Sequence, residues 1–529
     1  MERMNIKNVV IVGGGTSGWM AATLFTRYFK GNLNVTLVES STIPKVSVGE
    51  STTSQINDFF TLCGLEDKDW MKESNATYKN SIKFTDFKEL DHSFQYPFGG
   101  SRVPQSIWGW AQVAANYDLG GESFASFMNS SNYLLAEENK QSDNRHNVLK
   151  NYDFKHDTAY HFDAELFAKY LKDKVCIPNG VVHHMDDIVG TNKDDDGYVT
   201  SIIGNNGEYS GDLFIDCTGF RSLLLEEEMG SEFLSFKPWL SNDKALATHI
   251  PYTNREEQLT NVTNCTAIEN GWVWNIPLWD RIGTGYCYSS DFVDDETALK
   301  EFKNHLGLED IEVNKINIRH GIRKDGWVKN VVGVGLAYAF VEPLESTSLI
   351  STHQILSIIV ELLERRDFNV NRFDIDGYNQ QASQVMLGYR DFVSHHYALS
   401  SRTDTPYWKY HTQEKDYRNV PDDQFYPIHL ESGGTTFSNA YEMTLFFHQF
   451  EHIWDISNVG MSYIMAGMGQ VPISKYLLQW VRNTDPEVDA KIAKIYEEWI
   501  EEYENNKKIV ATLPSCIDFL REHIYGFDN

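Results

Sequence analysis

Short apolar runs and a helical stretch follow one another at the start of the chain. Asn8 to Val12 reads NVVIV, an uninterrupted apolar run that predicts a buried β-strand. The segment WMAATLFTRYF predicts a helix, and Val35 to Val38 predicts a second strand that ends at Glu39. We therefore predict a strand–helix–strand unit in this part of the chain.

Similar apolar runs return in two distant places. Asp212 to Gly219 (DLFIDCTG) and Asn330 to Ala337 (NVVGVGLA) each predict another buried strand. A helix is expected after Asp163, which is well placed as its N-cap, and Ile350 to Arg366 reads as a long amphipathic helix. Because the strands lie so far apart in sequence, we expect them to form one discontinuous domain.

A glycine-rich turn connects the first predicted strand to the first helix. In a G-x-G-x-x-G loop, the first glycine makes a tight turn, the second lets the backbone approach a pyrophosphate, and the third allows close helix packing. The free N–H groups at the helix start bind phosphate, and an acid about twenty positions later accepts from ribose hydroxyls. The alternative is a turn without a ligand, and the loop alone leaves NAD and FAD open. The predicted dinucleotide site consists of Gly13, Gly15, Thr16, Ser17, Gly18 and Glu39.

A second motif, Trp272-Val-Trp274-Asn-Ile276-Pro277, lies in the middle of the chain. Two indoles at positions i and i+2 point to the same side of an extended strand. In an arbitrary chain this pattern is explained by two core aromatic residues. Its combination with a dinucleotide loop gives it a second interpretation, which depends on the resemblance below.

Composition narrows the function further. The chain has 529 residues and a formal net charge of −29, which argues against nucleic acid or an anionic membrane as a partner. It has neither a secretory signal pattern nor an apolar stretch of about 18 residues, so we expect a cytoplasmic protein. The histidine pairs at 183–184 and 395–396 lack further ligands at metal spacing, so no metal site is predicted. Six scattered cysteines favour reduced thiols over disulfides.

Several segments in the same order resemble the flavin-dependent tryptophan halogenases: VVIVGGGTSGW, VGES, FIDCTGF, GWVWNIPLWDRIGTGYCYSS and FVEPLESTS. The resemblance is weaker past about residue 370. It implies an α/β fold, in which a Rossmann-like FAD-binding domain of the flavin monooxygenase type (1–100 and 155–350) is joined by a mainly helical substrate-binding subdomain (101–154 and 351–529).

The resemblance also implies the chemistry. In this family, FADH2 from a separate flavin reductase, oxygen and a halide (chloride, bromide or iodide) give hypohalous acid. The acid travels through a tunnel to an aromatic small molecule, which is halogenated by electrophilic substitution. The protein supplies confinement and orientation, while the cofactor supplies the redox chemistry.

Two residues match the catalytic positions of the family. Lys79, in NATYKNSIKF, matches the tunnel lysine, which binds the oxidant by a hydrogen bond or as a haloamine; the alternative is a surface lysine in a lysine-rich stretch. Glu345, in PLEST, matches a glutamate that orients the oxidant, stabilises the cationic intermediate or takes its proton. The alternative for Glu345 is an acid that complements the dipole of the following helix.

Other positions carry over in the same way. Glu50 in VGES and Ser346 match segments that contact the flavin, and the backbone N–H groups of Thr347 and Ser348 match the halide site. Some members have glycine at the position of Ser348. Trp272 and Trp274 match the pair that forms a barrier between the flavin oxidant and organic substrates.

The substrate side departs from the tryptophan-specific enzymes. Where those have His-x-Phe, this chain has Tyr96 and Phe98, although His92-Ser-Phe94 just upstream leaves a shifted alignment open. Trp454 matches a pocket tryptophan, while the paired tyrosines and the acid that hold the amino-acid backbone are not evident. An indole or phenol therefore fits better than free tryptophan.

Two other functions remain open at this stage. A flavin-dependent aromatic monooxygenase would hydroxylate its substrate directly, but the intact W-x-W-x-I-P and Lys79 argue against it. The other is a non-enzymatic role, as a tRNA-modification or flavin-binding partner protein. The acidic charge disfavours RNA binding, and FAD binding without turnover of reduced flavin would favour this role. Dimers are common in the halogenase family, which leaves a homodimer open.

Overall fold

A computed structural model of the protein describes residues 3–42, 49–99, 105–121, 123–415, 458–469 and 475–527. The chain divides into two compact units, each of which is made of three separate stretches. Unit 1 consists of residues 1–76, 161–237 and 319–390, and unit 2 of residues 77–160, 238–318 and 391–529. The predicted boundaries at 100, 155 and 350 differ from these, so the assignment of cofactor and substrate roles to domains stays a prediction.

A six-stranded sheet forms the centre of unit 1, in the order β21–β22–β13–β2–β3–β9. The strands from β22 to β9 are parallel, and β21 runs antiparallel at the edge. Their continuous apolar runs suit a parallel sheet, in which both faces are covered. All four strands predicted from sequence are present, but two are shorter than predicted: β13 ends at Asp216, and β22 ends at Gly333, before a 3-10 turn at Gly335–Ala337. The bounds are β2 (Asn8–Val12), β3 (Asn34–Glu39), β9 (Val182–Met185), β13 (Leu213–Asp216), β21 (Trp327–Val328) and β22 (Val331–Gly333).

Three helices of unit 1 pack against one another beside β2 and β3. Helix α1 (Thr16–Phe29) contacts both strands and also packs against α8 (Ala164–Tyr170) and α11 (Thr347–Arg365). Asp163 caps α8 as predicted, because its carboxylate accepts from the N–H groups of Glu165 and Leu166. Helix α11 begins three residues before the predicted start at Ile350.

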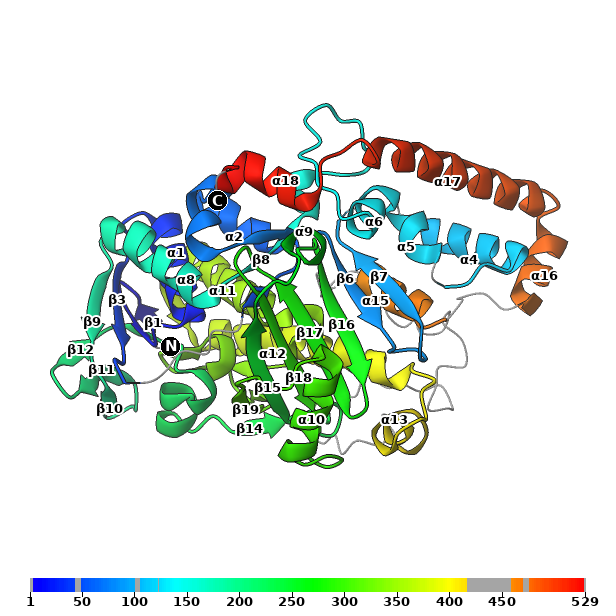
Figure 1. The fold of residues 1–529 in the computed structure, drawn as a ribbon. Helices are drawn as coiled ribbons and strands as arrows, with labels where there is room; N and C mark the ends of the chain where they lie inside the picture. Colours follow the sequence, from blue (N-terminus) through cyan, green and yellow to red (C-terminus); the bar gives the residue numbers. More distant parts are fainter. Residues whose placement is uncertain are drawn as a thin grey trace. The chain divides into compact units, whose positions relative to one another are not determined.

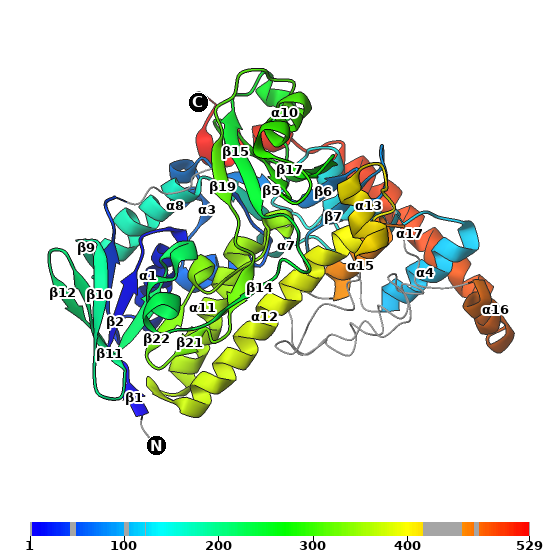
Figure 2. The same cartoon turned by 90° about the horizontal axis from the view of Figure 1, so that it is seen from below.

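Smaller elements complete unit 1. Strands β10, β11 and β12 lie beside β9 in both views (Figure 1, Figure 2), and residues 194–198 connect β10 to β11. The remaining bounds are β1 (Arg3–Asn5), β4 (Glu50–Ser51), α2 (Ile56–Cys63), α3 (Asp67–Trp70), β8 (Ala159–Phe162), β10 (Ile188–Lys193), β11 (Val199–Gly204), β12 (Glu208–Ser210), β14 (Phe233–Ser235), β20 (Gly321–Arg323), β23 (Ala339–Phe340) and β24 (Asn369–Asn371).

Unit 2 contains a seven-stranded sheet in the order β19–β15–β18–β17–β16–β6–β7 (Figure 1). All neighbours are antiparallel except β16 and β6, which are parallel. The W-x-W-x-I-P motif forms most of β17, near the middle of the sheet. The bounds are β6 (Ser81–Thr85), β7 (Ser93–Pro97), β15 (Lys244–Ile250), β16 (Val262–Ile268), β17 (Gly271–Pro277), β18 (Ile282–Tyr288) and β19 (Asn314–Asn317).

A helical layer belongs to the same unit. The long helix α17 runs along α4, α5 and α6 (Figure 1), and their shared core includes Trp110, Phe124, Phe127 and Trp499. Helix α12 begins in unit 1 and ends in unit 2. The bounds are α4 (Gln105–Tyr117), α5 (Ser123–Met128), α6 (Ser130–Glu137), α7 (Phe154–Asp157), α9 (Arg255–Gln258), α10 (Asp295–Leu306), α12 (Arg372–Ala398), α13 (Pro406–Lys409), α15 (Asn458–Gly467), α16 (Lys475–Thr484), α17 (Val488–Val510) and α18 (Cys516–Leu520).

The described part of the chain agrees with the predicted mixture of secondary structure. In ranges 101–154 and 351–529 its regular elements are helices apart from the short strand β24, and the predicted α/β class is confirmed. All six cysteines are free thiols. Among the described helices, none is both long and apolar enough to cross a bilayer. Within the described residues of the whole chain, no group of three or more His, Cys, Asp or Glu side chains could hold a metal ion.

Candidate functional site

The glycine loop between β2 and α1 has the geometry expected of a phosphate cradle. Gly13 has a φ of +112°, and an ideal Cβ there would lie 2.2 Å from the carbonyl oxygen of Cys217. At Gly18 an ideal Cβ would lie 2.0 Å from the carbonyl oxygen of Gly13, so the helix packs closely at this position. At Gly15 it would meet nothing within 4 Å. The loop is therefore tight at its first and third glycines and open at the second.

The open position is also the start of the helix. Gly15 is the N-cap of α1, and no side chain caps the helix there. The first N–H groups of α1 thus have no intrahelical acceptor, and they carry the positive end of the helix dipole. A pyrophosphate fits this arrangement, because backbone N–H groups bind it and the missing side chain at Gly15 leaves room for it.

Glu39 lies next to this loop, where the sequence places it. An ideal Cβ on Gly14 would lie 1.8 Å from its Oε2 atom, and the carboxylate is only 3% exposed. Its Oε1 atom accepts from Lys172 Nζ and from His183 Nε2, each at 2.9 Å. Burial, joined by the positive charge of Lys172, lowers the pKa of His183, so the neutral ring still donates one N–H to Glu39.

Lys172 and His183 were not predicted from the sequence as site residues. Lys172 follows α8, and His183 lies on β9 beside β3, in register with Leu37. Neither has a local motif, because both reach Glu39 only through the packing of distant segments. They hold the carboxylate that was predicted to accept from the ribose.

Three distant segments meet at the first turns of α1 and α11. Ser17 Oγ lies 3.4 Å from Thr352 Oγ1, and an ideal Cβ on Gly335 (φ +63°) would lie 2.4 Å from the same Ser17 oxygen. Gly335 and Thr352, which lie on either side of the FVEPLESTS segment in the sequence, thus both approach Ser17 of the glycine loop. The role of FVEPLESTS as a cofactor-contacting segment stays a prediction.

The short strand β4 contacts the start of α11. Ser346 Oγ donates to Ser51 Oγ at 3.1 Å, and Ser348 Oγ donates to Glu50 Oε2, also at 3.1 Å. Desolvation raises the pKa of Glu50 to about 7, against the opposing effect of the Ser348 hydrogen bond. The predicted flavin residues Glu50 and Ser346 are therefore adjacent to the predicted halide residue Ser348.

The turn before α11 carries the predicted acid and the predicted halide amides. Glu345 ends the turn η7 (Pro343–Glu345), is 2% exposed, and precedes the N-cap Ser346, whose φ is +57°. The Ser346 side chain does not cap α11, and Thr347 and Ser348 are the first residues of the helix. Their N–H groups have no intrahelical acceptor, so this helix start is able to bind a small anion.

In unit 2, Lys79 ends the strand β5 (Thr77–Lys79) and is fully buried. Its Nζ atom lies 4.8 Å from the ring centroid of Phe98, within the range of a cation–π contact. Lys72 is exposed and Lys83 is partly exposed, whereas Lys79 is buried. The alternative that Lys79 is a surface lysine is therefore wrong. Burial of an amine costs free energy, which makes Lys79 a candidate for a functional role.

The W-x-W-x-I-P strand is connected to the lysine strand. Thr77 Oγ1 donates to the carbonyl oxygen of Pro277 at 2.6 Å, which fixes the end of β17 to the start of β5. Trp272 and Trp274 lie with ring centroids 5.8 Å apart. An ideal Cβ on Gly285 would lie 2.2 Å from the Trp274 ring, so the neighbouring strand leaves space for this indole. Both tryptophans are nearly fully buried.

The β6–β7 hairpin shows which of the two aromatic pairs lies near Lys79, while the alignment of that pair with the family stays a prediction. Its register sets Tyr96 opposite Ile82, and Phe98 N–H donates to the carbonyl oxygen of Asn80, next to Lys79. Phe94 instead stacks on Phe84, at 5.0 Å. Tyr96 and Phe98, rather than His92 and Phe94, therefore accompany the lysine. Trp454, the third predicted pocket residue, lies outside the described residues.

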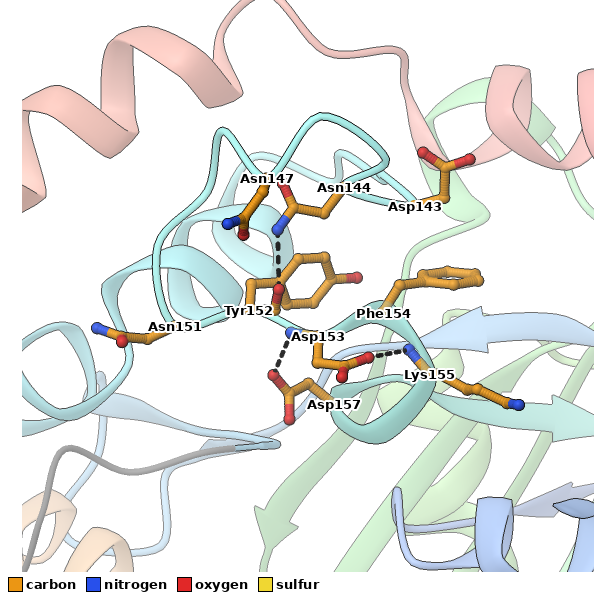
Figure 3. Close-up of a pocket in the computed structure, with 9 residues that line it drawn as sticks. All are labelled: Asp143, Asn144, Asn147, Asn151, Tyr152, Asp153, Phe154, Lys155 and Asp157. Carbon is orange, nitrogen blue, oxygen red and sulfur yellow. Dashed lines mark hydrogen bonds between the residues drawn. The ribbon is translucent and has the colours of Figure 1, made fainter.

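A cavity of about 640 Å³ lies elsewhere in unit 2 (Figure 3). A single stretch of chain lines it: Asp143, Asn144, Asn147, Asn151, Tyr152, Asp153, Phe154, Lys155 and Asp157. Hydrogen bonds within the stretch hold its shape, such as Asn144 Nδ2 to the carbonyl oxygen of Tyr152 at 2.8 Å. None of the predicted site residues lines this cavity.

Comparisons with known proteins agree with these arrangements. Residues 8–481 match the family model described as tryptophan halogenase. The chain is 37% identical over 449 residues to tryptophan 6-halogenase SttH of Streptomyces toxytricini, with 80% of this chain and 83% of the relative covered. The apo structure of VirX1 has a TM-score of 0.88 and 43% identity, and the match covers 99% of each chain.

A further solved structure extends the comparison to flavin dependence. Tar14, described as a tryptophan C-6 flavin-dependent halogenase from taromycin biosynthesis, has a TM-score of 0.81 and 30% identity, with 97% of this chain and 99% of that one covered. The family match and these nearly full-length likenesses lead to one conclusion. The chain belongs to the tryptophan halogenase family of flavin-dependent halogenases.

Proposed function

We propose that this protein is an FADH2-dependent halogenase of an indole- or phenol-type small molecule. The overall reaction consumes FADH2, O2, a halide ion, a proton and the arene, and it gives FAD, the aryl halide and two molecules of water. Bound reduced FAD supplies the redox chemistry that turns oxygen and halide into hypohalous acid. A separate flavin reductase supplies the FADH2, since the sequence has no evident second dinucleotide loop for NADPH.

The cofactor is held by backbone groups of unit 1. The N–H groups at the start of α1 bind the pyrophosphate above Gly15, where an added Cβ would meet nothing within 4 Å. Glu39 accepts from the ribose hydroxyls, and its orientation is fixed by Lys172 and His183. Glu50 and Ser346 line the flavin. Their two segments contact each other, because Ser348 donates to Glu50 and Ser346 donates to Ser51.

The halide is held at the start of α11 by the N–H groups of Thr347 and Ser348. Chloride, bromide and iodide are all candidate ligands of such a site, because backbone N–H donors bind any of the three anions. Glu345 is buried immediately before it and, by resemblance to the family, orients the oxidant or takes the proton of the arenium intermediate. Trp272 and Trp274 exclude organic substrates from the flavin.

Lys79 binds the hypohalous acid and directs it at the arene. The single observation that carries this proposal is the complete burial of Lys79 beside the Phe98 ring, on a strand fixed to the W-x-W-x-I-P strand by Thr77. An ammonium donates a hydrogen bond to the oxidant, and an amine forms a haloamine with it. Either way the oxidant meets the substrate in a fixed orientation, which favours one ring position.

The substrate packs on the aromatic side chains near Lys79. Phe98 offers a ring for stacking, and Tyr96 lies 5.8 Å from it. Trp454 is proposed as a third wall by resemblance to the family. A small indole or phenol suits this set better than free tryptophan, since the residues that hold an amino-acid backbone in the tryptophan-specific enzymes are not evident in the sequence.

The test is mass spectrometry of an indole and phenol panel incubated with the protein, FAD, a flavin reductase and NADH. Each reaction is run with chloride, bromide or iodide and without halide. We expect a halogen mass shift that disappears when either protein or halide is omitted. A shift of one oxygen without halide dependence would instead establish the monooxygenase. If FAD binds but reduced flavin gives no product with any panel member, the enzymatic proposal fails for these substrates.

A further inference from the structure

A series of aromatic rings leads away from Lys79 through unit 2. Phe98 lies under the Lys79 ammonium, and Tyr96 lies 5.8 Å from Phe98. Tyr463, on α15, stacks on Tyr96 with ring centroids 5.2 Å apart and an interplanar angle of 27°. Phe124, on α5, meets Tyr463 edge-on at 5.1 Å. We call Phe98, Tyr96, Tyr463 and Phe124 the ring series.

Helix α15 is adapted to this contact. Gly460 lies one turn before Tyr463, and an ideal Cβ there would lie 2.7 Å from the Tyr96 hydroxyl oxygen. The missing side chain lets the Tyr96 hydroxyl approach the helix backbone while the Tyr96 ring stacks on Tyr463. The first turns of α15 therefore fix Tyr96 from two sides, and through Tyr96 they reach the ring beside Lys79.

The hydroxyl of Tyr463 is not explained by packing. Tyr463 is 2% exposed, and within the described residues its hydroxyl has no hydrogen-bond partner. Two buried tyrosines of β18 in the same unit do have partners: Tyr286 donates to Glu301 at 2.8 Å, and Tyr288 donates to Asp295 at 3.0 Å. Within the described residues, the hydroxyls of Tyr338 and Tyr378 in unit 1 also have no partner, but neither residue belongs to the ring series. Leaving a buried hydroxyl unpaired costs free energy, and a phenylalanine would fill the same space without that cost.

We propose that Tyr463 is a substrate-specificity residue, whose hydroxyl binds a hydrogen-bonding group carried by the aromatic ring of the substrate. A tyrosine hydroxyl both donates and accepts, so it suits a phenolic hydroxyl as well as an indole N–H. The group it binds belongs to the end of the substrate away from the carbon that meets the oxidant at Lys79. This inference rests on the proposed function, whose substrate class it makes more specific.

The experiment compares the wild-type protein with Tyr463→Phe, which removes one oxygen and keeps the ring. Substrates are used in matched pairs, phenol with anisole and indole with N-methylindole, so that the second member of each lacks the donor. We expect the KM for phenol or indole to rise about tenfold, as for one lost buried hydrogen bond. The KM for the methylated partner and kcat should stay nearly unchanged.

Thermal unfolding of the substrate-free protein provides a readout independent of activity. Tyr463→Phe should unfold at the same temperature as the wild type or higher, because the lost hydroxyl has no partner in the described structure. Tyr286→Phe is the matched control. It loses the hydrogen bond to Glu301, so its melting temperature should fall while its KM values stay at the wild-type level.

The outcomes separate this inference from the proposed function. Consumption of monochlorodimedone, a small acceptor of free hypohalous acid, reports the halogenase itself. If wild-type protein does not consume it, the proposed function and the inference fail together. If both proteins consume it equally but Tyr463→Phe leaves every KM unchanged, or raises it equally for methylated substrates, only the assignment of Tyr463 is wrong. A response of one substrate pair alone would identify the group as phenolic or indolic.

Discussion

In unit 1 most predicted cofactor residues come from one continuous loop, whereas in unit 2 the residues around Lys79 come from separate strands and a helix. In the proposed site the loop would bind through backbone N–H groups, so the absence of side chains at its glycines matters most. Around Lys79 the contacts are made by side chains: a lysine on β5, rings on β7 and α15, and a threonine that reaches β17. Adding a side chain should therefore impair the function of the glycine loop, whereas removing side-chain atoms should impair the region around Lys79.

The largest effect is expected from removing the Lys79 side chain. Lys79→Ala should reduce halogenation by about 100-fold or more, the scale of losing a positioned catalytic group, while FAD affinity stays at the wild-type level. Initial rates by mass spectrometry and flavin titration measure the two quantities. Lys83→Ala, on the neighbouring strand β6, is the control and should keep the wild-type rate. Normal halogenation by Lys79→Ala would show that the tunnel mechanism is wrong.

The glycine loop gives the opposite experiment, in which a methyl group is added. Gly15→Ala should leave the melting temperature of the FAD-free protein unchanged, since the new Cβ meets nothing, and should weaken FAD binding about tenfold or more. Gly18→Ala should destabilise even the FAD-free protein by about 1–3 kcal/mol, because its Cβ would clash with the carbonyl of Gly13. Equal effects of both substitutions on the FAD-free protein would contradict this division of roles.

A smaller effect is expected at the connection between β5 and β17. Thr77→Val keeps the shape of the side chain but removes its hydrogen bond to the carbonyl of Pro277, so unfolding should become easier by about 1–3 kcal/mol. Halogenation should fall more than stability alone predicts, because Lys79 lies two residues further along the same strand. Chemical denaturation and initial rates test the two parts. Thr85→Val on β6 should change stability by less than about 0.5 kcal/mol.

The smallest effect concerns the pH dependence of stability at Glu50. Its pKa is raised from 4.5 to about 7 in the folded protein, so the folded state is destabilised as pH rises through that interval and the carboxyl ionises. Glu50→Gln should match the wild type below pH 4.5 and exceed it above pH 7. Because Glu50 is partly exposed, we expect a difference of only about 1 kcal/mol. Melting temperatures of both FAD-free proteins across this pH range measure the difference. A difference that does not change with pH would contradict the prediction.

The contrast between the two regions also explains what was predictable. The roles of Gly13, Gly15 and Gly18 follow from a loop of six residues, whose geometry depends on local backbone sterics. The N-cap Asp163 is local for the same reason. By contrast, Lys172 and His183 meet Glu39 only because β9 pairs with β3 and α8 packs on α1, and no sequence pattern marks either residue.

The aromatic side of the site shows the same limit. The sequence alone left two alignments open, Tyr96 with Phe98 or His92 with Phe94. Only the fold shows that the Phe98 N–H donates to the carbonyl oxygen of Asn80, next to Lys79, while Phe94 lies opposite Phe84. Tyr463 was not among the predicted residues, because nothing in its own segment indicates that its hydroxyl would be buried without a partner.

The sequence by itself determined the strand–helix–strand unit, the glycine loop with its acid, the α/β class and the family to which the chain belongs. These depend on apolar periodicity and backbone conformation, which neighbouring residues set. The tertiary structure alone decided that Lys79 is buried rather than exposed, that Phe98 is the ring beside it, and that Ser348 contacts Glu50. Burial and side-chain contacts are set by segments far apart in the chain, and only folding brings those segments together.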